Sequence, residues 1–504
     1  MDPRSDRYDV VVVGAGLGGL SAAACLARAG SSVLVVERQD GPGGNAHAFA
    51  RGAYTFDPAI HITAHGFNVE FLSWYLEAVG ADERVDLMLL DPLYSVEVDG
   101  ERFSYPVGEG PLTEYFVDLF PSEAKGIRAY FEVCADTTRE SQAPPPRVAV
   151  KDLESMMAAL PLLFKYRTQT LAEVIAEFVA DPHARSLLGA QWPYMGLPPS
   201  KLSFLTGTGV WMALMEQGPV YVRGSFQKLA DGLAWAIEER GGEILYERTV
   251  TGIRVDGEAV TGVVLDDGRE IRAGSVVSNA DAVQTLEHMV GVEHLPERYV
   301  KRLRRMKPSV SAVMVYSACT LPIEESGLAS EVFVYEHWDH DETWADVSAG
   351  HLGGMWLSVP TLHDSSLAPE GEHLVMLTSL MPYDIGEPWS GAKQRYQELL
   401  VDRVDKLLPG YRDSITFLDS ATPETFERYT LAQKGAIYGW ENTPNQSQPK
   451  RLPFETPIEG LYLAGHWTDP GTGSVRCLLS GLRAAAAVTG EADPFAFLQK
   501  LEKA

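Results

Sequence analysis

YDVVVVGAGLGGLSAA, at residues 8–23, is the most informative segment of the chain. A β-branched run at residues 8–13 leads into a glycine turn at 14–19, and an alanine-rich stretch follows at 20–29. A second β-branched run covers residues 32–37. This order predicts a strand, a tight turn, a helix and a second strand, which together form a βαβ unit.

The glycines of the turn have distinct expected roles. Gly14 permits the tight turn out of the strand, Gly16 lets the backbone approach a pyrophosphate, and Gly19 lets the helix pack closely on the sheet. The helix N-terminus offers unpaired N–H groups and a positive dipole end to the phosphates. Glu37 ends the second strand, where its carboxylate can accept hydrogen bonds from ribose hydroxyls. The ordered set predicts a dinucleotide site, because a glycine turn that served packing alone would not need the acid.

Two further glycine-rich segments extend this prediction. Gly43 and Gly44 allow a second backbone approach to the same phosphates, although an ordinary turn also accounts for such a pair. LYLAGHWTDPGTG, at residues 461–473, predicts a strand that stops at Gly465 and feeds a new helix. The N-terminus of that helix suits a ribityl chain and the electron-rich edge of a reduced flavin. A site for NAD alone would not require this second segment from the C-terminal end of the chain, so we expect FAD as the cofactor.

Composition and charge exclude several classes of protein. A chain of 504 residues with 45% hydrophobic content is long enough for two or three structural lobes. Its formal charge of −27 would repel nucleic acid and anionic lipid headgroups. The polar N-terminal residues 1–9 leave no room for a signal peptide, and no stretch approaches the roughly 20 apolar residues of a spanning helix. We expect a cytoplasmic protein that binds no nucleic acid.

No metal site, disulfide framework or hydrolytic site is expected. The cysteines lie far apart without a CxxC pair, which favours reduced and mostly buried thiols at Cys25, Cys134, Cys319 and Cys477. HWDHD, at residues 337–341, resembles a set of metal ligands, but it lies in a turn-like stretch without recognisable spacing, so a solvated loop is expected. No Ser, His and Asp order or carboxylate pair stands out, and hydrolysis is therefore not supported.

The rest of the chain divides into a helical part and two sheets. Residues 66–215 have the pattern of helices with proline breaks, including a polar, proline-rich boundary at Gln142–Arg147. After a helix over 225–239, hairpin turns at Asp256-Gly257 and Asp267-Gly268 predict an antiparallel meander attached to the nucleotide-binding part. The strand before the meander is expected at 243–246, and the strands of the meander are expected at 249–255, 260–265 and 270–272. A second sheet is expected from strands at 311–319, 331–335, 355–359 and 373–381, followed by a helix at 393–408, a strand at 460–464 and a helix at 477–489.

The sequence resembles the phytoene desaturase, carotenoid isomerase and retinol saturase branch of the flavin amine-oxidase-like superfamily. The likeness covers nearly the whole chain and is weaker between about 66 and 220. It is carried by GAGLGGLSAA (14–23), PGGNAHAFARGAYTFDPAIHI (42–62), RGSFQKLADGLAWAIEERGGEI (223–244), DDGREIRAGSVVSNAD (266–281) and GAIYGWENTPNQSQPKRLPFETPIEGLYLAGHW (435–467).

The resemblance implies an α/β fold with a Rossmann-type FAD-binding domain, a mixed-sheet substrate domain and a helical lobe, as in amine oxidases and p-hydroxybenzoate hydroxylase. It implies that the backbone of Val250 holds the adenine ring and that residues 57–62 pass close to the isoalloxazine ring. The expected boundaries are 1–65, 223–290 and 435–495 for the FAD-binding domain, 66–150 and 291–434 for the substrate domain, and 151–222 for the lobe.

Two positions depart from the pattern of the superfamily. His466 stands where many members have an acid, which puts the usual carboxylate contact with the ribityl chain in doubt, while Gly465 and Gly473 keep the pattern. Arg476 stands where a glycine is expected. A cation there would stabilise the anionic reduced flavin or bind a substrate carboxylate, unless it simply points outward to solvent.

The resemblance also implies the chemistry. We expect hydride transfer from a C–H bond of a carotenoid, polyene or lipid chain to flavin N5, leaving a new C=C bond, with dioxygen or a quinone as electron acceptor. His61 is a candidate for orienting substrate or moving a proton, or it only packs. Alternatives are a cis-trans isomerase or saturase, an amine or amino-acid oxidase that uses Arg476 as an anchor, and a non-enzymatic scaffold.

A lipophilic substrate raises the question of membrane contact. LPLLF, at residues 160–164, lies beside Lys165 and Arg167 and suits a shallow peripheral contact with the inner face of the membrane. The acidic charge of the chain argues against such a contact. Most large apolar side chains between 150 and 220, Met156 included, are expected to form core.

Overall fold

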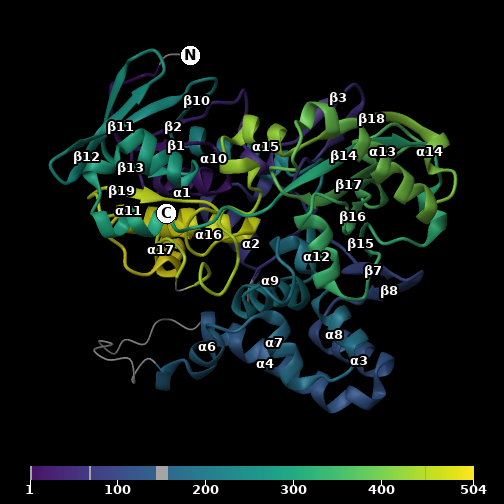
Figure 1. Ribbon diagram of the computed structural model, residues 1–504. Helices are drawn as coiled ribbons and strands as arrows, with labels where there is room; N and C mark the ends of the chain where they lie inside the picture. The colour runs from purple at the N-terminus through teal and green to yellow at the C-terminus, as the bar shows by residue number, and fades with distance from the viewer. Residues whose placement is uncertain (1–2, 67–69, 143–156, 449, 504) are drawn as a thin grey trace.

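The computed structural model describes residues 3–66, 70–142, 157–448 and 450–503. Two seven-stranded sheets lie side by side, and a group of helices lies below the second one (Figure 1). This arrangement confirms the expected α/β class. Met156 and residues 143–147 of the expected proline-rich boundary lie outside the described residues, and the three-domain division remains a prediction.

The first sheet joins both ends of the chain. The expected βαβ unit is confirmed, and β19 near the C-terminus pairs with β13 in parallel. β12 runs antiparallel to both its neighbours, as the two hairpin turns predict. The strands are, in order, β10 (Glu243–Leu245), β2 (Val33–Val36), β1 (Arg7–Val13), β13 (Glu270–Ser278), β12 (Ala259–Leu265) and β11 (Val250–Asp256), with β19 (Leu461–Leu463) beside β13.

Helices from opposite ends of the sequence pack against each other on this sheet. α1 (Leu17–Arg28) lies beside α16 (Ser474–Val488), and α10 (Gln227–Glu239) packs on the other side of α1. The contact between α1 and α16 is close enough that a Cβ atom added to Gly481 would lie 2.2 Å from the carbonyl oxygen of Gly18. α17 (Pro494–Glu502) and α2 (Phe71–Val79) pack beside this group.

The second sheet faces the first sheet. Three of its strands, β14 (Ser311–Cys319), β15 (Glu331–Tyr335) and β17 (His373–Met381), match the expected bounds, because apolar and β-branched residues predominate in each. α13 (Trp389–Leu407) packs its apolar side chains on this sheet. The order is β18 (Ile415–Ala421), β14, β17, β16 (Met355–Ser358), β15, β7 (Tyr94–Val98) and β8 (Glu101–Tyr105).

The expectation of helices throughout residues 66–215 was wrong in part. β7 and β8 form a hairpin around Asp99 and Gly100, both with positive φ, and β7 pairs in parallel with β15. Five-residue strands show little periodicity of their own, and the strand that joins this hairpin to the sheet, β15, is more than 200 residues away from β7 in sequence. A further three-stranded sheet contains β5 (Thr63–Ala64), β9 (Pro219–Val222) and β6 (Leu87–Leu89), and β3 (Phe49–Arg51) pairs with β4 (Tyr54–Phe56).

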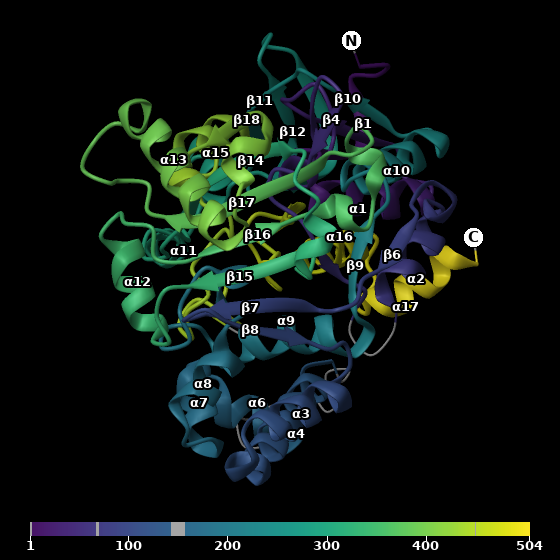
Figure 2. The same cartoon turned by 90° about the vertical axis from the view of Figure 1, so that its right-hand side faces the viewer.

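The helices of the middle part lie beyond the β8 edge of the second sheet (Figure 2). They share one core with β7 and β8. None of the helices in the described part of the chain is long and apolar enough to cross a membrane. The helices are α3 (Glu109–Leu119), α4 (Ala124–Gln142), α6 (Pro161–Tyr166), α7 (Leu171–Phe178), α8 (Pro182–Gly189) and α9 (Phe204–Gln217).

Candidate functional site

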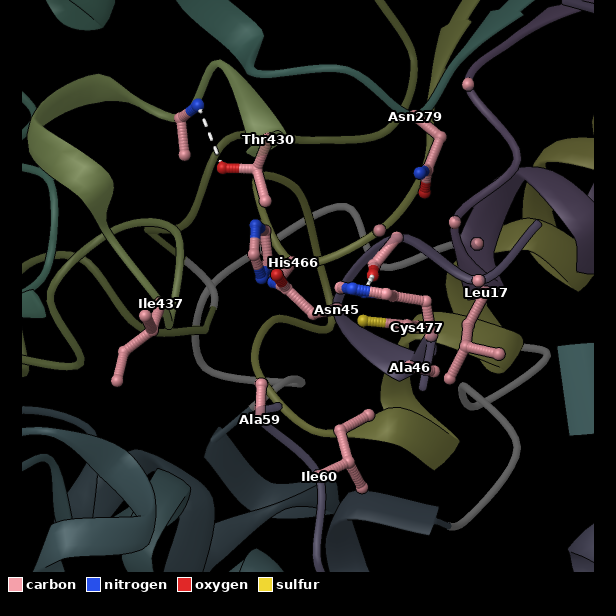
Figure 3. A pocket seen from close by; sticks show the side chains of 18 of the residues that line it. Leu17, Asn45, Ala46, Ala59, Ile60, Asn279, Thr430, Ile437, His466 and Cys477 are labelled. Carbon is pink, nitrogen blue, oxygen red and sulfur yellow. Dashed lines mark hydrogen bonds between the residues drawn. The ribbon is translucent and has the colours of Figure 1, made fainter. Parts of the chain in front are cut away.

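A cavity of about 890 Å³ lies between the two large sheets. At one end its wall is made by the carboxyl ends of the parallel strands and the loops that follow them. At the other end it is made by the second sheet, through Met314, Trp356 and Thr378, and by Val210 and Leu214 of α9. Figure 3 shows Leu17 and Asn279 at one side of this space, His466 and Cys477 near its middle, and Ile437 at the opposite side.

The predicted cofactor residues meet at the first end. All of them except Gly19 line the cavity: Gly14, Gly16, Glu37, Gly43, Gly44, Val250, Gly465, His466 and Gly473. A Cβ on Gly19 would lie 2.1 Å from the carbonyl oxygen of Gly14, which is the close helix–strand packing expected of it. Gly14 has φ +92°, as its turn requires. The structure therefore brings residues from three distant segments to one place.

Two helix N-termini open onto this cavity. α1 begins after Gly16 and α16 begins after Gly473, and neither N-cap makes a side-chain hydrogen bond. Their first N–H groups therefore remain available to a ligand, beside the positive ends of the helix dipoles. A pyrophosphate at α1 and the electron-rich edge of a flavin at α16 fit these two positions, so the residues present fit FAD.

Glu37 supports the glycine turn as well as facing the cavity. One carboxylate oxygen accepts the N–H of Ala15 at 2.7 Å, and the other accepts the N–H of Gln39 at 2.8 Å. Each oxygen keeps a lone pair, so the expected contact with ribose hydroxyls stays available. Gly43 donates its N–H to the carbonyl oxygen of Ala15 at 2.8 Å, which joins the second glycine pair to the first turn.

Asn279 was missed by the sequence analysis. It follows β13 and lies where the glycine turn meets the C-terminal loop. A Cβ on Gly16 would lie 2.4 Å from its Nδ2 atom, and one on Gly465 would lie 2.6 Å from its Oδ1 atom. These glycines therefore make room for an amide as well as for the cofactor. An asparagine at the end of a strand gives no signal in sequence, because its neighbours come from other segments.

Arg451 was also missed, and it holds the C-terminal loop in place. Its side chain is 3% exposed and donates to the carbonyl oxygens of His466 at 2.6 Å and Thr468 at 3.2 Å, and to Oδ1 of Asn442 at 3.1 Å. The carbonyl oxygen of Tyr438 is a further acceptor, at 3.3 Å. A guanidinium with its donors in a fixed fork can join two loops in this way.

His466 presents a neutral ring to the cavity. Burial, with a smaller contribution from the positive charge of nearby Arg451, lowers its pKa to about 4. His466 is therefore neutral at the position where the resemblance implies a carboxylate. Burial also lowers the pKa of His47, whose Nδ1 lies 2.6 Å from the carbonyl oxygen of Gly44.

Arg476 lines the cavity, and its guanidinium lies against α9. A Cβ on Gly209 would lie 2.5 Å from its Nη2 atom. Burial lowers the pKa of Arg476 to about 10, and Asp469, the carboxylate that opposes this shift, is itself paired with Arg483. Within the described residues no hydrogen bond or ion pair engages the Arg476 side chain. A half-buried cation of this kind needs an electron-rich partner from the bound ligand.

Replacing Arg476 tests its expected role as a counter-ion of reduced flavin. In Arg476→Gln we expect the two-electron reduction potential of the bound flavin to fall by about 60 mV, equivalent to roughly 2.8 kcal/mol, because the anionic reduced form loses a cation. Arg476→Lys should retain most of the potential. Dye-equilibrated reductive titrations measure it, and an unchanged potential with weaker binding of acidic ligands would instead support the carboxylate-binding alternative.

His61 lies on the wall between the two ends of the cavity. Its Nδ1 lies 2.7 Å from the Ser358 hydroxyl oxygen and accepts from Nε1 of Trp356 at 3.4 Å. Its Nε2 is buried and has no hydrogen-bond partner within the described residues. Burial lowers the pKa of His61 to about 4. His65, by contrast, is outside the cavity wall, where its Nε2 lies 2.7 Å from the Ser73 hydroxyl.

The expectation of a solvated loop at residues 337–341 was wrong for His340. This residue is buried at the start of α12 (His340–Ser348), where it accepts from Nε1 of Trp192 at 3.1 Å and bonds the Ser186 carbonyl at 2.9 Å. Among the described side chains no three that could hold a metal converge. The cysteines are free, and all except Cys477 are buried, as expected.

Comparison with known proteins identifies the family. The model of the flavin containing amine oxidoreductases matches residues 17–489. The chain belongs to this family. It is therefore a flavoprotein enzyme that binds FAD, and both expectations are confirmed.

Relatives of this flavin oxidoreductase include three kinds of enzyme. Prolycopene isomerase 2 of an Oncidium hybrid cultivar is 30% identical over 97% of this chain and 84% of its own length. The neurosporene-forming phytoene desaturase of Rhodobacter capsulatus is 27% identical over 94% and 92%, and the all-trans-retinol 13,14-reductase of Danio rerio is 27% identical over 91% and 82%. The resemblance inferred from the motifs is confirmed.

Solved structures confirm the fold. Cyclohexylamine oxidase of Brevibacterium oxydans superimposes with a TM-score of 0.64 over 96% of this chain and 99% of its own, at 17% identity. The roles of individual site residues, including His61 and Arg476, remain predictions.

Proposed function

We propose that this flavoprotein dehydrogenates a lipophilic polyene or lipid chain and forms a new C=C bond. The observation that carries this proposal is the continuity of one cavity, which runs from the glycine turns to a wall of apolar side chains. Ile60, Ile62, Leu214 and Ile437 belong to that wall. Such a space accommodates a hydrocarbon and excludes water from the site. The names of the relatives, which include a phytoene desaturase, support the same substrate class.

In this proposal the residues that line the cavity have different roles. FAD, when bound, accepts a hydride at N5. The glycine turns and the N-terminus of α1 bind its pyrophosphate, and Arg476 offers the positive charge that an anionic reduced ring requires. The apolar wall orients the chain so that a C–H bond faces the ring. His61 is one of the polar side chains among these apolar neighbours, together with Tyr194 and Thr378.

Isomerisation or saturation of a polyene is the second candidate. It uses the same cavity with reduced flavin, and the prolycopene isomerase and retinol reductase among the relatives favour it. An amine or amino-acid oxidase would require Arg476 to bind a substrate carboxylate beside these apolar side chains, which the lining supports less well.

Anaerobic mixing of the yellow holoenzyme with phytoene and with neurosporene in detergent tests the proposal. Dehydrogenation bleaches the oxidised flavin band and yields a product with two fewer hydrogens and one more C=C bond per flavin reduced. Product that appears only after prior reduction of the flavin would replace desaturation with isomerisation or saturation. Bleaching by amines or amino acids, with peroxide released in air, would overturn both.

The electron acceptor and the peripheral contact of the protein with a membrane are part of the same proposal. Dioxygen or a quinone would reoxidise the flavin, since the sequence holds no second glycine-rich turn in a strand–helix context for NAD(P)H. Pro161 and Lys165 of α6 are exposed while Leu162, Leu163 and Phe164 are half-buried, which keeps a peripheral membrane contact open as a route for a lipophile.

A further inference from the structure

α9 has a gap at Gly209, and this gap faces Arg476. A Cβ atom added to Gly209 would lie 2.5 Å from Nη2 and 3.8 Å from Cζ of the Arg476 guanidinium. Apart from its chain neighbours and the backbone of its own helix, no other described atom would lie within 4 Å of that Cβ. The absence of a side chain at position 209 therefore makes room for one group, the end of the Arg476 side chain.

The backbone of α9 does not require a glycine at this position. Gly209 lies in the interior of the helix and is not among the glycines with positive φ. Glycine within a helix is less favourable than alanine, because it loses more conformational freedom on folding. The residue therefore lowers the stability of the helix, and the contact with Arg476 accounts for its presence.

α9 is held firmly on the side of the arginine. The N–H of Ser203 donates to the carbonyl oxygen of Asn442 at 2.8 Å, and the hydroxyl of Thr206 donates to Oγ of Ser447 at 2.9 Å. The side chain of Asn442 in turn accepts from Arg451 at 3.1 Å. The start of α9 is thus attached to the segment before the C-terminal loop. Filling the gap at Gly209 would move the flexible guanidinium rather than the helix.

No acid fixes the position of the Arg476 charge. Among the described side chains none forms an ion pair with Arg476, and Asp469 pairs with Arg483 instead. Burial, with a smaller contribution from the charge of Arg476, lowers the pKa of Arg451 to about 10. Repulsion between the two guanidinium groups therefore opposes a swing of Arg476 toward Arg451. The gap at Gly209 gives the cation a defined position that an ion pair does not provide.

The same region of α9 borders the cavity. Ala213 lies one helical turn after Gly209, and both Ala213 and Val210 line the cavity together with Arg476. The guanidinium therefore lies between the N-terminus of α16, where the flavin edge fits, and the helix that forms part of the apolar wall.

We propose that Gly209 is a positioning residue that holds the guanidinium of Arg476 in one place beside the flavin site, and so helps to determine how tightly reduced flavin is bound. The inference rests on the part of the proposed function that makes Arg476 the counter-ion of the reduced ring, and it deepens that part. Gly209 does not itself line the cavity and acts through Arg476. Gly209→Ala would leave the cation in the protein but remove its defined position, whereas Arg476→Gln removes the charge.

The ratio of the affinities for reduced and oxidised FAD tests this position. In Gly209→Ala we expect the ratio to fall about tenfold, which is about 30 mV for a two-electron couple, because Coulomb attraction depends on distance. In the Arg476→Gln background the same change should have no effect, because the shorter side chain has no guanidinium to displace. Dye-equilibrated reductive titrations of the four holoenzymes give the ratios.

Gly207→Ala is the matched control in the same helix. The nearest neighbours of its added Cβ outside the helix would be side-chain atoms of Leu202 and Leu171, at 3.3 and 3.4 Å, so the ratio should stay unchanged. A ratio that Arg476→Gln lowers but Gly209→Ala leaves unchanged would overturn the proposal. An equal effect of Gly209→Ala in both backgrounds would also overturn it.

Urea unfolding is a second readout that needs neither flavin reduction nor a substrate. In the Arg476→Gln background Gly209→Ala should raise the unfolding midpoint, because alanine favours the helix and its methyl group fills the vacated space. With Arg476 present, displacement of the guanidinium should offset this gain. The same shift of the midpoint in both backgrounds would end the proposal. Holoenzymes that differ as expected but react with no polyene would keep the role of Gly209 and remove the proposed function.

Discussion

Gly481→Ala should lower the free energy of unfolding by about 3 kcal/mol and release FAD, because the added methyl group overpacks a contact between two helices. The new Cβ would lie 2.2 Å from the carbonyl oxygen of Gly18 and 2.8 Å from the backbone nitrogen of Ala22. Both neighbours are backbone atoms of α1, so no side chain can turn away. α1 and α16 must separate, and the two N-termini that face the cavity move with them.

Gly391→Ala is the matched control for this change. Gly391 lies in the first turn of α13, with no atom within 4 Å of an added Cβ. Alanine there should be neutral or stabilise the helix by up to about 1 kcal/mol. Urea unfolding followed by flavin fluorescence measures both variants. Equal unfolding midpoints and equal flavin affinities for the two would contradict the packing argument.

Sequence alone could predict the elements whose pattern is local. The βαβ unit, the hairpins at Gly257 and Gly268, and the long apolar strands β14 and β17 follow from periodicity and turn residues that lie within one window of the chain. Local patterns also predict that both ends of the chain contribute to one site. At each end a glycine turn leads into a helix N-terminus, which suits an anionic ligand.

The remaining features depend on distant partners. β7 is stabilised by pairing with the distant strand β15, and Ser358 is held in the sheet, in contact with His61, only because β16 pairs with β15 and β17. Asn279 and Arg451 resemble ordinary polar residues in sequence, since the groups that they contact belong to other segments. His340 shows the same limit, because a histidine among acids has the composition of a loop and becomes buried only when α8 and Trp192 cover it.

Arg451→Met should destabilise the protein by about 4 kcal/mol and abolish flavin binding at micromolar concentration. Methionine has a similar length but no donors, so the carbonyl oxygens of His466, Thr468 and Tyr438 lose a charged partner while they stay buried. Each lost hydrogen bond to a charged group is worth roughly 1.5–3 kcal/mol, and the losses at one side chain overlap. The loop after β19 then no longer holds Gly465 and Gly473 at the cavity.

Two further variants separate the donors of Arg451 from its charge. Arg451→Lys keeps the charge but loses the fork, and we expect about half the destabilisation. Arg254→Met removes an exposed arginine that pairs with Glu270, and it should cost less than 1 kcal/mol, as is usual for surface ion pairs. Urea unfolding and flavin titration of the four proteins give the comparison. If Arg451→Met retained flavin as tightly as Arg254→Met, the loop would be held by other contacts, and Arg451 would have no part in forming the site.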